Sequence, residues 1–147
     1  MAAAATAYLH FLSMIAIGAV LSGELLLTQS LREPDQVRRL AWVDLGYLIA
    51  AGIVLATGLM RFIWFGKGAQ FYLHNPVFYI KLALFVAIVL ISIPPTHHIV
   101  RWRIEALAGK LPPQYDVAHV RRYIVTELVL FLCIPLAAVL AARGIGT

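Results

Sequence analysis

The chain has 147 residues, of which 62% are hydrophobic and only 13% are charged. Soluble domains average about 45–50% apolar and about 25% charged residues, so this chain lacks the polar surface of a water-soluble globule. The composition excludes a soluble enzyme, a disordered chain and, with Cys133 as the single cysteine, a disulfide-stapled secreted domain. The net charge of +5 fits basic residues that flank membrane spans, so we expect a lipid bilayer and no nucleic acid as partner.

Four apolar segments are long enough to cross a bilayer, which takes about 20 residues per helix. They cover approximately residues 4–29, 40–65, 76–93 and 120–142 of a single transmembrane domain, 1–147. Connections between them are short, which makes neighbouring helices antiparallel. The expected fold is all-α, a four-helix transmembrane bundle.

Prolines mark the expected ends of the third span. Asn75-Pro76 is typical of a helix start, with proline at the first helical position. Pro94-Pro95 predicts a stop, because a proline inside a helix removes a donor and clashes with the preceding turn. The stretch from Thr96 to Gly109 is then expected to form a short amphipathic helix on the cytoplasmic side.

Basic residues predict the orientation of the bundle. The first and third loops are rich in them: Arg32, Arg38, Arg39, Arg101, Arg103, Lys110, Arg121 and Arg122. The second loop region and the C-terminal tail hold only Arg61, Lys67 and Arg143. Since basic loops stay in the cytoplasm, we expect both termini to face outward.

Ionisable residues inside spans are costly and normally face the bundle interior. His10 and Glu24 lie 14 residues apart, nearly four helical turns, and so share a face of the first span. Met14, Ile17 and Leu21 complete that stripe, which we expect to be the interior face of the helix.

Several polar residues have an ordinary structural interpretation as well. A lone histidine near a helix end is often interfacial, and Lys81 could extend its ammonium group to the outer interface. The acidic residues could pair with a basic partner or a histidine across the bundle. This interpretation concerns Glu24, Asp44 and Glu127 on one side, and Arg39 and Arg122 on the other.

Two histidines on neighbouring elements are the usual ligands of a b-type haem held between helices. His10 on the first span and His74 before the third have the required residue type and approximate depth, and are the candidate iron ligands. Arg61 and Lys81 lie at a similar level and could neutralise the propionates. On the opposite side, Glu24 and Glu127 could move protons, as the candidate catalytic residues.

A series of short motifs runs through the chain. Its members are Tyr8-Leu-His10-Phe, Glu24-Leu-Leu, Gly58-Leu-Met-Arg61, Gly66-Lys-Gly, Phe71-Tyr, His74-Asn-Pro-Val-Phe-Tyr-Ile-Lys81, Ser92-Ile-Pro-Pro-Thr96, Arg101-Trp102, Glu127-Leu and Ile134-Pro135-Leu. With these the chain resembles a bacterial family of small four-span membrane proteins, catalogued as domain of unknown function 2214. The resemblance covers nearly the whole chain and implies the bacterial inner membrane, but it brings no activity.

Leu9-His10 and Lys81-Leu82 support a looser resemblance. They are similar to a Leu-His motif and a Lys-Leu pair of HemJ, the membrane protoporphyrinogen oxidase, where these positions are implicated in haem binding and catalysis. The chain differs from HemJ in lacking its Trp-rich start and in carrying Glu24. The similarity therefore favours a common bundle more than a common reaction.

The leading functional prediction is a haem-binding inner-membrane redox protein, a candidate haem-dependent oxidoreductase. It would transfer electrons or oxidise a lipophilic substrate, a quinone or a porphyrinogen, with haem b as cofactor. The alternative is a non-enzymatic small-ion or proton transporter, or an accessory structural subunit. A homodimer is also expected, because four spans enclose only a small interior.

Overall fold

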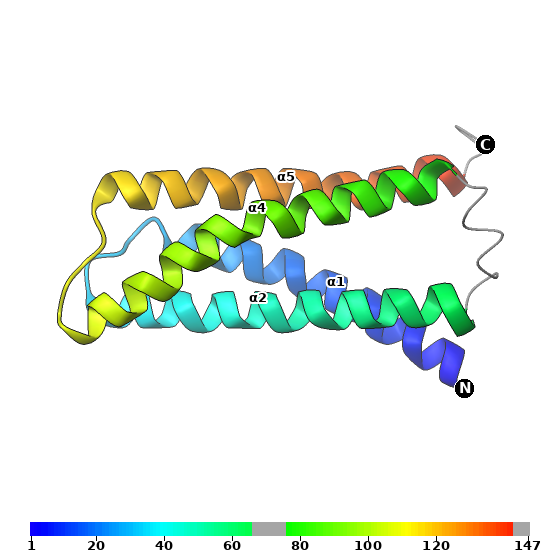
Figure 1. Ribbon diagram of the computed structural model, residues 1–147, viewed down its shortest axis with the longest axis horizontal. Coiled ribbons are helices and arrows are strands. Elements are labelled where there is room, and N and C mark those ends of the chain that lie inside the picture. Colours follow the sequence, from blue (N-terminus) through cyan, green and yellow to red (C-terminus); the bar gives the residue numbers. More distant parts are fainter. Residues whose placement is uncertain (66–75, 143–147) are drawn as a thin grey trace.

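The computed structural model describes residues 1–65 and 76–142, and there it contains helices and no strand. Figure 1 shows the long helices lying side by side. They are α1 (Ala2–Leu27), α2 (Pro34–Met60), α4 (Pro76–Leu107) and α5 (Gln114–Ala142), and α2 continues into the π-helical turn η1 (Arg61–Phe65). The predicted all-α bundle is therefore confirmed for the described residues.

Local sequence signals explain where α2 begins and where α4 ends, next to the two short connections. At the start of α2, Glu33 and Gln36 form a capping box and Pro34 occupies the first turn, so backbone amides that a helix start leaves free are satisfied. After α4, Gly109 adopts a positive φ of 71°, a conformation that glycine reaches without a steric penalty. The chain can therefore reverse direction here and enter α5.

The predicted stop at Pro94-Pro95 is wrong. Helix α4 continues through both prolines to Leu107, so the predicted third span (76–93) and the separate amphipathic helix from Thr96 to Gly109 are one continuous helix. Each proline removes one backbone hydrogen bond, but helices in membranes tolerate this because neighbouring helices re-satisfy the backbone. Pro95 itself is buried against the bundle, so packing outweighs the local signal.

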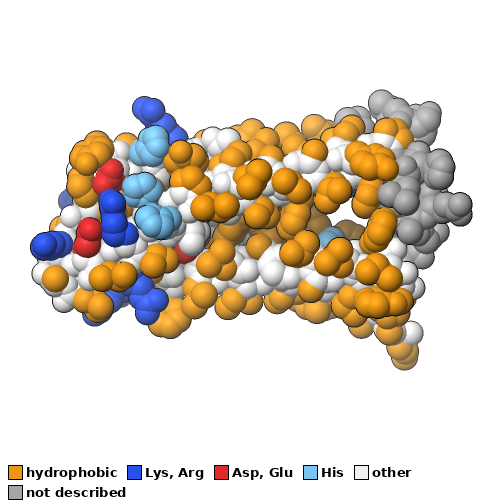
Figure 2. Space-filling view, in the orientation of Figure 1, with side chains coloured by type: hydrophobic (Ala, Val, Ile, Leu, Met, Phe, Trp, Pro, Cys, Tyr) orange, Lys and Arg blue, Asp and Glu red, His pale blue; other side chains and the backbone are white. Residues whose placement is uncertain are grey.

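The surface of the bundle is that of a membrane protein. Figure 2 shows most of the charged and histidine side chains gathered at one end, and mainly hydrophobic side chains along the middle of the bundle, where a histidine is visible in a hollow. By length and composition, three described helices could cross a membrane: Ala2–Leu27, Pro34–Phe65 and Pro76–Leu107. That α5 makes the fourth crossing stays a prediction.

The interior stripe predicted for α1 is confirmed. Ile17, Leu21 and Glu24 are buried, and His10 and Met14 are half-buried. On the same helix, a methyl group added at Gly18 would lie 3.2 Å from Phe131 of α5. The absence of a side chain at Gly18 therefore lets this aromatic ring pack directly on the α1 backbone.

We expect Gly18→Val to lower the free energy of unfolding by about 1–3 kcal/mol, because the new methyl groups overlap Phe131. The matched control is Gly52→Val, since an added Cβ at Gly52 meets nothing within 4 Å. Thermal unfolding of the detergent-solubilised protein would compare the two variants. An equal decrease in stability for the two variants would show that the contact with Phe131 does not limit the size of the residue at position 18.

Candidate functional site

Three acidic side chains from three helices meet inside the bundle. Glu24 of α1 and Asp44 of α2 are each 3% exposed, and Glu127 of α5 is 1% exposed. The carboxyl group of Glu24 lies within electrostatic range of both others, and that of Glu127 within range of Asp44. We call this set, with the hydroxyl side chains described next, the carboxyl layer.

Hydroxyl groups complete the carboxyl layer. The Thr96 hydroxyl of α4 donates a hydrogen bond of 2.9 Å to Oδ1 of Asp44. The Tyr47 hydroxyl lies within interaction range of Ser92 and of the Glu127 carboxyl group. The layer thus receives side chains from all four long helices.

Among the described residues, no basic group forms an ion pair with a carboxyl group of this layer. Within residues 1–65 and 76–142, the ion pairs join Arg38 to Asp35, and Arg101 to Glu105 and Asp116. None of them includes a carboxyl group of the layer, and both Arg39 and Arg122 are exposed. The expected pairing with these arginines is therefore not observed.

Some buried polar atoms near the basic end also lack partners. In the described part of the chain these are Glu24 Oε1, His98 Nδ1 and Trp102 Nε1. Buried polar atoms without a protein partner are typical places for a bound water molecule.

The carboxyl layer is suited to holding protons. An isolated carboxylate is very costly to bury, and the usual remedies are a cation or a proton. No group of three or more His, Cys, Asp or Glu side chains among the described residues could hold a metal ion.

A second polar cluster lies toward the opposite end of α1, about 21 Å along the helix from Glu24. His10 Nδ1 is 2.9 Å from the Thr57 hydroxyl oxygen of α2, and a Cβ at Gly58 would lie 3.5 Å from the His10 ring. The Arg61 guanidinium lies within electrostatic range of His10 and 5.5 Å from the centre of the Phe11 ring.

Of the other predicted haem-site residues, Lys81 is half-buried on α4. No ion pair within the described ranges includes it. His74 lies outside the described residues. The structure thus brings His10 and Arg61 together, and a meeting of His10 with His74 stays a prediction.

A small cavity lies between the helices and has Tyr47 of the carboxyl layer in its wall. Its volume is about 30 Å³, enough for about one water molecule. The other residues of its wall are apolar: Met14, Ile17, Ala51, Val54, Phe85, Ile88, Val89, Phe131 and Ile134. In Figure 2 a hollow rimmed by hydrophobic side chains is visible on the face of α2 and α4.

Comparison with known families adds one finding. The family described as "Predicted membrane protein (DUF2214)" matches residues 2–146. The chain belongs to this family. No curated protein and no solved structure matches the chain, so the looser similarity to HemJ stays a prediction. Membership of DUF2214 confirms a membrane protein and says nothing about a reaction.

The sequence identified part of the carboxyl layer. Glu24 and Glu127 were expected to lie at similar depth, and Asp44 was expected near them only as a partner of a basic group. Tyr47 and Thr96 were missed. The sequence pattern that could have identified them is a pair of polar residues one helical turn apart, which lie on the same helix face. Asp44 with Tyr47 and Ser92 with Thr96 are such pairs.

We expect Thr96→Val to lower the free energy of unfolding by about 1–3 kcal/mol, because it leaves the buried Asp44 carboxyl group without its hydroxyl donor. Thr126→Val is the matched control, since the exposed Thr126 hydroxyl donates only to the Arg122 carbonyl oxygen of its own helix. Unfolding in detergent would compare both with the unmodified protein. A loss no larger than that of the control would contradict a structural role for the Thr96–Asp44 bond.

Proposed function

We propose that this membrane protein moves protons within the bilayer through the carboxyl layer. The observation that carries the proposal is the burial of Glu24, Asp44 and Glu127 next to one another, without a basic partner among the described residues. Acidic residues inside membrane bundles are rare, and they commonly mark proton or ion pathways.

The layer supplies the parts that a proton relay requires. A carboxylate of the layer can take up a proton from one side and, as a carboxylic acid, release a proton to a neighbouring carboxylate, so that a proton crosses the layer while the number of protons in it returns to its starting value. Tyr47, between Ser92 and Glu127, can accept a hydrogen bond with its hydroxyl oxygen while donating its own proton. Thr96 orients Asp44 through the bond of 2.9 Å.

The surroundings of the layer indicate how protons could reach it. On the side of the basic end, the unpartnered atoms of His98 and Trp102 offer hydrogen bonds to water. On the opposite side, the cavity next to Tyr47 has room for about one water molecule, and the His10–Thr57 pair lies farther along the bundle. Both ends of the proposed path thus have polar groups.

Proton movement can be measured in lipid vesicles that hold a pH-sensitive dye, with a potassium gradient and valinomycin as the driving force. We expect the wild-type protein to acidify the vesicle interior faster than protein-free vesicles do. Glu24→Gln, Asp44→Asn and Glu127→Gln should each slow this flux about 100-fold, the scale of a lost proton-transfer group. Glu105→Gln should keep the flux, because Glu105 pairs with Arg101 outside the layer.

Circular dichroism of each variant would show that the helices remain formed. Wild-type flux equal to that of protein-free vesicles would refute the proposal. The same conclusion would follow if all three substitutions in the layer left the flux unchanged.

A second candidate is the haem-binding redox protein, favoured by the surroundings of His10. Its Nδ1 is engaged by Thr57, which leaves Nε2 as the ligating atom, and such outer bonds orient histidine ligands. His74 would be the second ligand, and Arg61 and Lys81 would hold the propionates. The cavity of about 30 Å³ is far too small for a haem, which would have to bind at the half-exposed side of His10.

The haem would supply one-electron chemistry when bound. In this candidate the lipophilic substrate is a quinone or a porphyrin-like molecule, and Glu24 and Glu127 exchange protons during its oxidation. A homodimer would give each protomer a further apolar surface against which a flat ligand could pack.

An absorption spectrum of the purified protein tests the second candidate. A Soret band is expected, and His10→Ala should abolish it because the axial ligand is lost. Lys81→Ala should weaken haem retention while leaving the spectrum of bound haem similar. His119→Ala, which changes an exposed histidine, is the control. A colourless wild-type protein, prepared with haem present during expression, would exclude this candidate.

We further propose the bacterial inner membrane as the location, with both termini on the outer side. Support comes from the basic residues, which gather at one end of the bundle (Figure 2), the end at which the connections from α1 to α2 and from α4 to α5 lie. Basic connections of this kind stay in the cytoplasm.

A further inference from the structure

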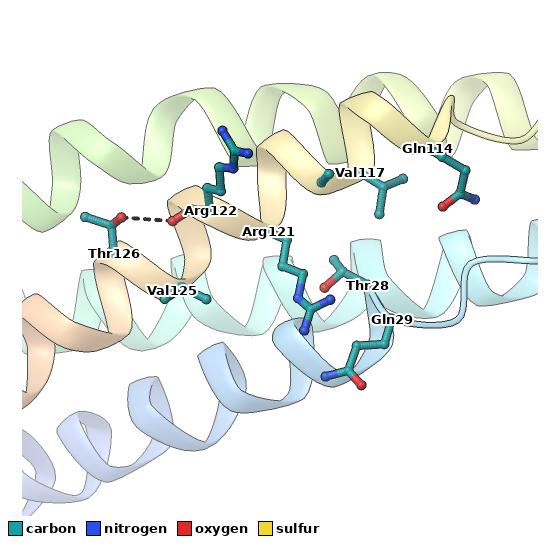
Figure 3. Close-up of a pocket in the computed structure, with 9 residues that line it drawn as sticks. Thr28, Gln29, Gln114, Val117, Arg121, Arg122, Val125 and Thr126 are labelled. Atoms are coloured by element: carbon teal, nitrogen blue, oxygen red, sulfur yellow. Dashed lines mark hydrogen bonds between the residues drawn. The ribbon is translucent and has the colours of Figure 1, made fainter.

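An open groove lies between the end of α1 and the first half of α5, outside the carboxyl layer. Its volume is about 670 Å³. The residues around it are Thr28, Gln29, Gln114, Val117, Ala118, Arg121, Arg122, Val125 and Thr126. Figure 3 shows the Arg121 side chain projecting from α5 into the gap toward Thr28 and Gln29, while Arg122 points toward the opposite side of α5.

The groove is positively charged. Arg121 projects its guanidinium group into it, Arg122 borders it with its guanidinium group turned away (Figure 3), and none of the residues around it is acidic. Neither arginine takes part in an ion pair within the described residues. Asp116, near the start of α5, pairs with Arg101 instead. The amide groups of Gln29 and Gln114 add neutral donors. A guanidinium group with nearby amides is a donor set that suits phosphate oxygens.

The groove also has an apolar side. Val117, Ala118 and Val125 contribute to its wall. Beyond it, Val129 and Leu132 are 56% and 61% exposed on α5, and they follow Val125 at spacings of four and three residues, on the same helix face. A ligand with a negative head at Arg121 could therefore lay an apolar tail along this face.

We propose that this groove binds the phosphate group of an anionic phospholipid, with Arg121 as the principal contact and the acyl chains along Val125, Val129 and Leu132. Grooves with basic side chains between membrane helices are typical sites for such headgroups.

Native mass spectrometry of the purified full chain would test the site, because it counts bound lipids and protomers in one measurement. The probes are phosphatidylglycerol, phosphatidylcholine and inorganic phosphate, each titrated into the delipidated protein. We expect phosphatidylglycerol to bind most tightly, and Arg121→Gln to weaken it about fivefold, the effect of one basic residue near a membrane surface. The matched control is Arg103→Gln, which removes an exposed arginine that lies over Trp42 outside the groove.

Four results of this experiment would each overturn the proposal. Equal affinity for phosphatidylcholine would show that the charge of the lipid is not recognised. Binding of inorganic phosphate as tight as that of phosphatidylglycerol would identify a soluble anion as the ligand. An effect of Arg103→Gln as large as that of Arg121→Gln would assign the lipid to general surface charge. A change from dimer to monomer on Arg121→Gln would make the groove an interface between copies.

Discussion

The burial of three acidic groups in one layer is the constraint on which the rest of this structure depends. Glu24, Asp44 and Glu127 are each at most 3% exposed. An unpaired charge in such surroundings costs several kcal/mol even after the protein has relaxed. The helices must therefore bring hydroxyl groups to these carboxyl groups or leave them protonated. The hydroxyl groups of Tyr47 and Thr96 meet this requirement.

The constraint also accounts for the way in which the bundle is packed. The largest fully buried side chains lie mostly on the basic side of the layer, among them Trp102, Leu40 and Val120. This tight packing encloses the acidic groups on the side where the basic residues meet water. On the other side the interior is looser, with the small cavity next to Tyr47. The two proposals for function use these two sides differently: proton movement requires both, and haem binding requires the region around His10.

The sequence predicted the elements of the fold better than their contacts. The spacing of Ile17, Leu21 and Glu24 was enough to find the interior face of α1, because residues three or four positions apart lie on the same face of an α-helix. The continuation of α4 could not be predicted, since local rules treat Pro94-Pro95 as a stop and burial of Pro95 is a property of the assembled bundle.

The candidate site was predicted in part for the same reason. The depth of Glu24 and Glu127 follows from their positions along the chain. Their contact with Asp44 and Tyr47 depends on how each helix is rotated about its axis, which contacts such as that between Gly18 and Phe131 help to determine. Thr96 was assigned to a separate surface helix, so that its hydrogen bond to Asp44 could not be anticipated.

The proline pair of α4 has a consequence for the backbone as well. In a regular helix, the carbonyl oxygens of Leu90 and Ile91 would accept hydrogen bonds from the amides of residues 94 and 95, but proline has no amide hydrogen. Helix α4 therefore continues through this turn with two fewer internal hydrogen bonds than a regular helix of its length, and without any unwinding. Since helices bend most readily at prolines, this turn is the place at which the half of α4 that carries Thr96 can change its angle to the rest of the helix.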